Sequence, residues 1–372
     1  MSEERKLQFH GGIGMSLIPV AIYVFFCMVL FIGCKAFNME ALAVGGFLAL
    51  LIGGIFCTSY NEFWESAIKG ISSITSVSVV VILLLVGMFS ALIKLCGLSG
   101  GFVWIANAVG MKGGIFVAFT FLAACIVSTA TGSSIGTMFI AFPIFYPAGI
   151  MLGANEMMMA GSIVSGAIFG DNLAPISDTT IAATRSQHCE MRDKFRVNFL
   201  TALPAALVTI VVLLIVGRPE TVTEIGDLSY SFIKVIPYLL VLILALVGMN
   251  VFLVLTIGIF AAGIIGLALG DLDIPLFAQS IWNGFTGMNE VFFLTLLCGG
   301  MSELIAKNGG IEWIIQKLGK VMKGNKSAQV GIAAMVSLCD CATANNTVAI
   351  IVAGDMAREV SHEYKVDPRR TA

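Results

Sequence analysis

The sequence has 372 residues, of which 58% are hydrophobic and 12% are charged, with a formal net charge of -2. Soluble domains carry about 25% charged residues, so this composition excludes an ordinary soluble protein and indicates a multi-pass membrane protein. The weak net charge, without a basic patch, argues against nucleic acid as a partner. Nine cysteines without CxxC pairs indicate neither a disulfide framework nor a zinc site.

Several segments have the length and composition of a membrane crossing, which takes about 20 apolar residues. They are residues 15–34, 40–60, 74–96, 195–217, 229–249, 251–270 and 286–306. The first is too long for the apolar region of a signal peptide and lacks a small-residue cleavage site, so we interpret it as a span that stays attached. The sequence therefore predicts an all-α polytopic membrane protein.

Two further apolar regions follow the third of these spans and are interrupted by polar residues. Residues 113–150 are cut by TATGSS, and residues 156–184 are cut by GDNLAPISDTT at 170–180. Non-helical backbone at membrane depth is tolerated only where protein or a polar cavity surrounds it, and carboxylates there mark ion or substrate paths. We expect a re-entrant hairpin followed by one broken crossing; two short crossings in place of the hairpin give the same topology.

Basic residues set the expected orientation, because cytoplasmic loops are enriched in lysine and arginine. The loop with Arg185, Arg192, Lys194 and Arg196 and the lysine-rich segment 307–326 are predicted to be cytoplasmic. The acidic loop at 218–228 is predicted to face outside. Counted from a cytoplasmic N-terminus, three crossings place residues 97–112 outside.

The two halves of the chain share short matches in the same order. FWESAIKG at 63–70 pairs with FAQSIWNG at 277–284, GGFVW at 100–104 with GGIEW at 309–313, MKG at 111–113 with MKG at 322–324, and TGSS at 131–134 with TANN at 343–346. Ordered matches of this kind indicate a duplication. Because the first GGFVW is predicted outside and its lysine-rich equivalent inside, the copies have opposite topology, as in inverted-repeat secondary transporters.

We therefore divide the chain into a first inverted repeat, 1–217, and a second, 218–372. The second is expected to contain its own re-entrant hairpin at about 328–356, between two basic flanks. The offset of 212 between TGSS and TANN places the counterpart of Gly170 at position 382, beyond Ala372. The second repeat is thus expected to be incomplete at its C-terminus.

Polar residues at the hairpin tips and at the helix break are candidate ion ligands. Freed carbonyls and helix ends, with hydroxyl and amide oxygens, can replace the water shell of a small cation. Alternatively, the hydroxyls only let helices pack closely, helped by the spacing of Gly132 and Gly136. Because two repeat-related clusters occur, we favour Na+ binding by Thr131, Ser133, Ser134, Asp171, Asn172, Ser177, Asp178, Thr179, Asp340, Thr343, Asn345, Asn346 and Thr347.

Asp171 and Asp178 are the carboxylates of the break, with Pro175 between them. A carboxylate at this depth can hold a proton or a cation, and competition between the two is sufficient for antiport. The alternative is that one of them caps the half-helix that follows. We expect at least one to bind the ion.

GDNLAPISDTT, followed by a basic loop, and TANNTVAIIVAG with DPRR downstream resemble the NhaC-type Na+/H+ antiporter family of the ion transporter superfamily. The resemblance covers essentially the whole chain. It implies Na+/H+ exchange in a bacterial or archaeal inner membrane, with no cofactor, at a site shared between hairpin tips and broken helices. Members of the family continue past DPRR, which implies that this chain is C-terminally truncated.

Two other functions are compatible with parts of the sequence. The resembled family includes malate/lactate antiporters, but organic-acid exchange should need a cationic or amide-rich pocket, and no lysine or arginine lies at predicted mid-membrane depth. An intramembrane aspartyl protease has no use for an inverted repeat and is disfavoured, so we expect no enzyme. The expected partners are Na+, H+, membrane lipid and, in the organic-acid alternative, a small organic acid; the oligomeric state stays open, with a homodimer as one option.

Overall fold

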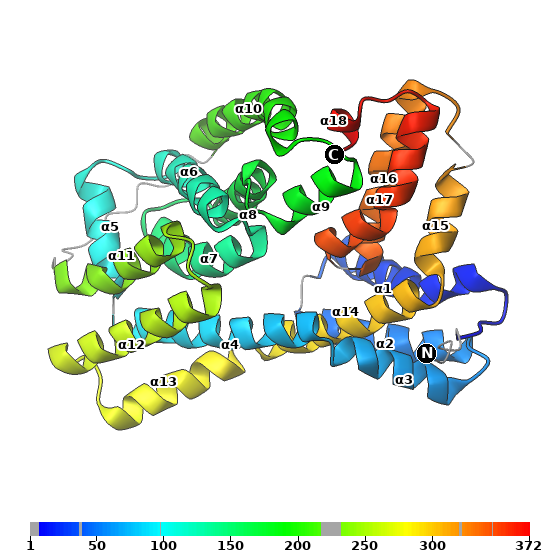
Figure 1. Ribbon diagram of the computed structural model, residues 1–372. Coiled ribbons are helices and arrows are strands. Elements are labelled where there is room, and N and C mark those ends of the chain that lie inside the picture. The colour runs from blue at the N-terminus through cyan, green and yellow to red at the C-terminus, as the bar shows by residue number, and fades with distance from the viewer. Residues whose placement is uncertain (1–6, 37–38, 97, 217–231, 320–321, 344) are drawn as a thin grey trace. The chain divides into compact units, whose positions relative to one another are not determined.

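The structure is a computed structural model that describes residues 7–36, 39–96, 98–216, 232–319, 322–343 and 345–372 (Figure 1). The acidic loop predicted at 218–228 lies outside these residues. Within the described ranges all regular secondary structure is helical, apart from an isolated β-bridge that joins Phe9 to Cys57. The predicted all-α class is confirmed.

Among the described helices, seven are long and apolar enough to cross a membrane, so the chain is a multi-pass membrane protein. Five of them match predicted spans: Ile13–Gly33, which contains α1 (Ile18–Met28), α4 (Ile74–Leu95), α10 (Met191–Val216), α12 (Val251–Leu269) and α14 (Asn289–Lys307).

The other two are α6 (Gly114–Thr131) and α7 (Ser134–Met151), the arms of the predicted first hairpin. Each arm has 18 residues, or about 27 Å at the α-helical rise, against a hydrocarbon core of about 30 Å. Their length alone fits either a hairpin or two short crossings.

One predicted span is shorter as a helix, and the start of another lies outside the described residues. The predicted span 40–60 becomes α2 (Met39–Ile55), and a new helix, α3 (Tyr60–Ile71), begins before that span was expected to end. The reason is a local cap, because Ser59 accepts a hydrogen bond from the backbone N–H of Glu62. In the second case, the predicted span 229–249, the described helix α11 covers Phe232–Leu246.

The chain forms two compact units, and each combines segments from both halves of the sequence. Unit 1 contains Met1–Val81, Ala182–Glu190 and Asn289–Ala372, whereas unit 2 contains Ile82–Ile181 and Met191–Met288. The chain passes from unit 2 into unit 1 within α9 (Asp178–Ser186).

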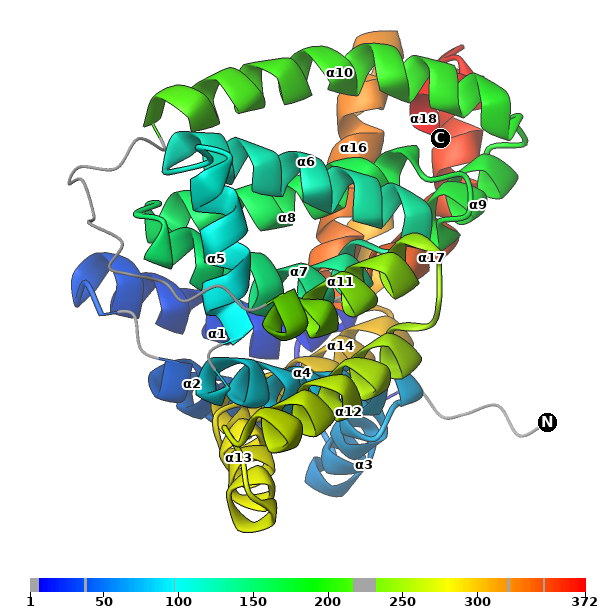
Figure 2. The ribbon, with the colours of Figure 1, turned by 90° about the vertical axis from the view of Figure 1, so that its left-hand side faces the viewer.

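Within unit 2, α6 and α8 (Glu156–Leu173) lie side by side, and α10 runs along both of them (Figure 2). Helices α5 (Leu98–Ala108), α7, α11, α12 and α13 (Ile274–Thr286) belong to the same unit. Its core is apolar, with large side chains such as Phe89, Phe116, Phe145 and Tyr238 fully buried. Buried polar groups in this unit therefore need a specific explanation.

Within unit 1, α14 packs against α2 and α3, and α16 (Asn325–Thr343) pairs with α17 (Asn346–Glu363). The unit also contains α1, α15 (Gly310–Gly319) and the short α18 (Pro368–Thr371). One apolar cluster gathers around Phe63 and Leu304, and another around Met335 and Ala353. The α16–α17 pair covers the predicted second hairpin, 328–356.

One ion pair in unit 2 joins segments that are far apart in the sequence. Lys234 Nζ lies 2.7 Å from Asp271 Oδ2, as an ion pair rather than an aligned hydrogen bond. The same ammonium donates to the carbonyl oxygen of Cys96 at 3.0 Å, directly after α4 ends. A cation at a helix C-terminus satisfies free carbonyls and complements the helix dipole.

Candidate ion site and adjoining pocket

The first hairpin reverses direction through two residues. Gly132 ends α6 in the left-handed conformation, with φ of 65°, which glycine adopts without steric penalty. Ser133 then caps α7, because its Oγ accepts a hydrogen bond from the backbone N–H of Gly136 at 3.1 Å. The TGSS sequence thus encodes the turn that we predicted there.

Hydroxyl groups gather at this hairpin tip. The hydroxyls of Thr131 and Thr137 lie 3.1 Å apart, and Thr131 Oγ1 lies 3.5 Å from the carbonyl oxygen of Ser133. Thr137 is fully buried and Ser134 is nearly so, whereas Thr131 and Ser133 are half-buried. The tip therefore presents several oxygens inside an otherwise apolar unit.

The helix break lies where GDNLAPISDTT predicts it. Helix α8 ends at Leu173, α9 begins at Asp178, and Pro175 lies between them without an N–H to continue the helix. Ser177 is buried, and its hydroxyl lies 2.7 Å from that of Thr179. The break is thus a second cluster of oxygens in unit 2.

The structure brings the hairpin tip and the break into contact. A Cβ atom at Gly132 would lie 2.8 Å from Ile176 Cγ1 and 3.0 Å from the backbone nitrogen of Ser177. Only a residue without a side chain allows this approach. Two oxygen clusters that are 40 residues apart in the sequence therefore meet in one unit.

Helices α6 and α8 approach each other through small residues just before this contact. A Cβ at Gly170 would lie 2.3 Å from the carbonyl oxygen of Cys125, and one at Gly166 would lie 2.5 Å from that of Phe121. Ser128 donates a short hydrogen bond, 2.5 Å, to the carbonyl oxygen of Ala167. A Cβ at Gly136, by contrast, would meet only Ser133, so the close packing expected at Gly132 and Gly136 occurs instead at Gly166 and Gly170.

The two aspartates of the break differ in environment. Asp171, next to Gly170, is 6% exposed, and its buried Oδ1 has no hydrogen-bond partner in the described structure. Asp178 is the first residue of α9 and is exposed. Of the two carboxylates, Asp171 is thus the buried one, with an oxygen that has no hydrogen-bond partner among the described residues.

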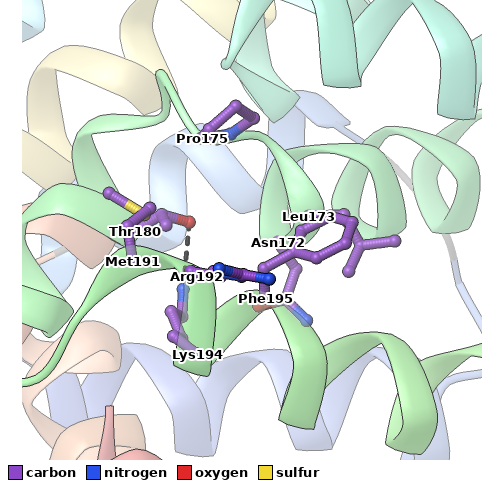
Figure 3. Close-up of a pocket in the computed structure, with 8 residues that line it drawn as sticks. All are labelled: Asn172, Leu173, Pro175, Thr180, Met191, Arg192, Lys194 and Phe195. Atoms are coloured by element: carbon purple, nitrogen blue, oxygen red, sulfur yellow. Dashed lines mark hydrogen bonds between the residues drawn. The ribbon is translucent and has the colours of Figure 1, made fainter.

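A pocket of about 410 Å³ adjoins the break (Figure 3). Its wall includes Asn172, Pro175 and Thr180 from the motif, and Arg192 and Lys194 from the first turn of α10. Lys194 is 4% exposed, and its Nζ donates to Thr180 Oγ1 at 2.9 Å. Lys194, predicted in a loop, instead lies in the first turn of α10, which begins at Met191 and packs this side chain against the motif.

The tip of the second hairpin, between α16 and α17, belongs to unit 1 and repeats the hydrogen-bond pattern of the first tip. Thr343 Oγ1 lies 3.1 Å from the carbonyl oxygen of Asn345, and Asn345 caps α17 by accepting from the N–H of Val348. Thr343 is buried, and its own carbonyl accepts a hydrogen bond from Ser302.

The structure thus divides the candidate ligands between the two units. Unit 2 holds Thr131, Ser133, Ser134, Asp171, Asn172, Ser177, Asp178 and Thr179, and unit 1 holds Asp340, Thr343, Asn345, Asn346 and Thr347. Asn172 is exposed, and its side-chain oxygen accepts from Asn198 in α10. Among the described residues, no three His, Cys, Asp or Glu side chains gather as metal ligands would; a cation at the tip would therefore depend on neutral oxygens and few carboxylates.

Comparison with known proteins decides the family. The sequence model of the Na+/H+ antiporter family matches residues 10–218, more than half of the chain. The chain belongs to this family. The predicted resemblance is confirmed, and a family of transporters excludes the protease alternative.

Individual members of the antiporter family are similar over most of the chain. A malate-2H(+)/Na(+)-lactate antiporter of Bacillus subtilis is 29% identical over 76% of this chain and 61% of its own length. An Na(+)/H(+) antiporter NhaC of Alkalihalophilus pseudofirmus is 28% identical over 69% of this chain and 58% of its own length. Another NhaC, from Bacillus subtilis, is 25% identical over 95% of this chain and 84% of its own length. The chain thus spans about 60% of the length of the first two relatives.

Proposed function

We propose that the protein exchanges Na+ for H+ across a bacterial or archaeal inner membrane, with Asp171 as the carboxylate that holds either ion. The carrying observation is the buried Oδ1 of Asp171, which lacks a hydrogen-bond partner among the described residues. An unpaired ionised carboxylate in such a site costs several kcal/mol. A proton or a Na+ ion removes that cost, and one carboxylate cannot hold both in the same way, so binding of one releases the other.

The oxygens around the break supply the rest of the proposed site. The hydroxyls of Ser177 and Thr179 belong to the break itself, and Thr131 belongs to the hairpin tip that contacts it through Gly132. Neutral oxygens of this kind replace the water shell of Na+ without adding charge. One carboxylate with several hydroxyls and carbonyls suits a monovalent cation.

Matching tips support the proposal that 1–217 and 218–372 are inverted repeats. In both tips a threonine hydroxyl approaches the carbonyl oxygen two residues later, from Thr131 to Ser133 and from Thr343 to Asn345. In both, that later residue caps the next helix. On this basis we propose that Asp340 and the second tip form an equivalent cluster of ion ligands within unit 1.

A second candidate is Na+- and H+-coupled exchange of small organic acids. It is favoured by the relative whose name describes a malate-2H(+)/Na(+)-lactate antiporter. Both candidates need a site for Na+ and H+, so they differ only in whether an acid moves as well.

The test is exchange by the purified 372-residue chain in liposomes, followed with a pH-sensitive dye after addition of Na+, Li+ or K+. Wild-type protein should move protons in response to Na+, and Asp171→Asn should abolish this movement while unfolding at the wild-type temperature. Asp355→Asn is the matched control, because Asp355 is exposed on α17, and it should exchange normally. Absence of Na+-dependent proton movement in wild type would overturn the proposal, whereas acceleration by malate or lactate would establish the second candidate.

A further inference from the structure

Two hydroxyl residues of α6 lie beside the buried aspartate and are not ligands of the proposed ion site. Ser128 and Thr129 are consecutive in α6, and a Cβ atom at Gly170 would lie 2.7 Å from Ser128 Cβ and 2.9 Å from the backbone nitrogen of Thr129. Helices α6 and α8 both belong to unit 2 and run side by side (Figure 2). The two hydroxyl residues thus lie next to the residue that directly precedes Asp171.

Ser128 reaches the backbone that carries Asp171. Its Oγ donates a hydrogen bond of 2.5 Å to the carbonyl oxygen of Ala167, from one helix to the other. Helix α8 is continuous from Glu156 to Leu173, and in an α-helix a carbonyl oxygen also accepts from the N–H four residues later. The oxygen of Ala167 therefore joins the hydroxyl of Ser128 to the amide of Asp171.

Thr129 supports the same stretch of backbone more weakly. Its Oγ1 donates within α6, to the carbonyl oxygen of Cys125 at 2.8 Å, and lies 3.3 Å from the carbonyl oxygen of Gly170. The Gly170 carbonyl belongs to the peptide bond that leads into Asp171. Two neighbouring hydroxyls of α6 thus contact two carbonyl groups that adjoin the amide of Asp171.

Close packing of the two helices does not by itself require a hydroxyl at position 128. Elsewhere in the contact α6 and α8 approach through small residues alone, such as Ala124 against Gly166, and an alanine would fit where Ser128 is fully buried. Packing between small residues tolerates a slide of one helix along the other, whereas a hydrogen bond has a defined length and direction. A slide by one residue, about 1.5 Å, would break the bond from Ser128.

We propose that Ser128 is a positioning residue for ion exchange and that Thr129 assists it. By fixing α8 against α6 one turn before Asp171, Ser128 sets where the buried carboxylate meets the oxygens of the hairpin tip and of the break. Neither hydroxyl binds the ion. This role rests on the proposed function, because it takes Asp171 as the ion carrier.

The test compares two buried serines of unit 2 whose hydroxyls bond to different helices. Ser128→Ala removes the hydrogen bond between α6 and α8. Ser162→Ala is the matched control, because Ser162 is also fully buried but its Oγ donates within α8, to the carbonyl oxygen of Met159 at 2.8 Å. Each variant loses one buried hydrogen bond, so both should melt at similarly lowered temperatures in detergent, as followed by circular dichroism.

The two variants should differ in how their exchange depends on Na+. Exchange is measured in liposomes with a pH-sensitive dye over a series of Na+ concentrations. Ser128→Ala should raise the Na+ concentration for half-maximal proton movement about 10-fold or more, the range seen when an outer-shell partner of a metal ligand is removed. The rate at saturating Na+ should be retained, because the variant weakens binding of the ion. Ser162→Ala should keep the wild-type dependence on Na+.

A second pair of variants keeps the test informative if Ser128→Ala fails to fold. Thr129→Val preserves the shape of the side chain and should raise the half-maximal Na+ concentration by a smaller factor, about threefold, because it removes a weaker hydrogen bond to α8. Thr120→Val is its control in α6, since the hydroxyl of Thr120 is fully buried and donates within the helix, to the carbonyl oxygen of Phe116 at 2.9 Å. It should leave the Na+ dependence unchanged.

Unchanged Na+ dependence in both Ser128→Ala and Thr129→Val would refute the positioning role, and so would an equal shift in Ser162→Ala. A lower maximal rate at an unchanged half-maximal Na+ concentration would also overturn it. If the wild-type protein exchanges Na+ for H+ and the variants behave like it, the proposed function stands and only the role of Ser128 and Thr129 is lost. If the wild-type protein shows no Na+-dependent proton movement, the proposed function fails and the positioning role fails with it.

Discussion

The close approach of α8 to α6 gives a stability prediction that two glycines of one helix can test. Gly170→Ala adds a Cβ atom 2.3 Å from the carbonyl oxygen of Cys125 and 2.7 Å from the Cβ of Ser128. Carbon–oxygen contacts between packed helices are about 3.3–3.6 Å, so the helices must separate by about 1 Å. Gly161→Ala is the control, because a Cβ at Gly161 meets no atom within 4 Å.

Both variants gain helix propensity, about 0.5–1 kcal/mol for alanine over glycine in a helix interior. This gain cancels in the comparison, so the difference between the two variants isolates the overpacking at Gly170, about 1–3 kcal/mol. Gly161→Ala should therefore melt slightly above wild type and Gly170→Ala below it, as measured by thermal unfolding in detergent with circular dichroism. Identical melting of the two variants would refute the close packing of α6 and α8.

Three further predictions follow from single contacts. Gly132→Ala should lower the melting temperature and slow Na+-dependent proton movement, because a left-handed alanine costs about 1–2 kcal/mol and its Cβ would clash with the helix break. Gly270→Ala is the control, because Gly270 also has a positive φ but lies in open space, and it should lower stability alone. Equal transport by the two variants would contradict a role for the contact at Gly132. Asp271→Asn should lower the free energy of unfolding by about 1 kcal/mol or less. Lys234→Met should lower it by more, because it also loses the hydrogen bond to the carbonyl oxygen of Cys96. The reverse order in thermal unfolding would refute the ion pair between Lys234 and Asp271. Asp178→Asn should weaken the apparent Na+ affinity in liposomes without abolishing exchange, and complete loss would make Asp178 the carrier instead.

Local features of the fold were predictable because short sequence signals encode them. Gly132 with Ser133 marks a left-handed turn and a helix cap, and Pro175 removes an N–H where a helix would otherwise continue. Each signal acts within one helical turn, so no knowledge of the tertiary structure is needed. The end of the second predicted span differs from the structure for the same kind of reason, because the local cap at Ser59 starts a new helix there.

Contacts between distant segments were not predictable in this way. The meeting of the hairpin tip with the break depends on how α8 packs against α6. The spacing of Gly166 and Gly170 is a sequence signal of that packing. Gly132 and Gly136 have the same spacing, but the Cβ position of Gly136 faces no other helix, so the spacing alone does not identify the packed pair. The sequence predicts Lys194 in a basic loop, because hydropathy cannot distinguish a lysine that packs at a helix start from one in water. Its burial appears only when α10 lies beside the motif.

The order of residues in the motif has a physical reason once these contacts are known. Gly170 lets α8 approach the end of α6, and the next residue, Asp171, is buried there with an oxygen that has no partner in the described structure. Asp178 begins a helix at an exposed position, where free backbone N–H groups favour a negative charge. Asp171 lies near the end of α8 rather than at a helix start, and in the exchange that we propose a proton or a cation compensates its charge. The small residue that permits close packing and the acid that this packing buries are therefore adjacent, and the exchange of ions that we propose depends on both.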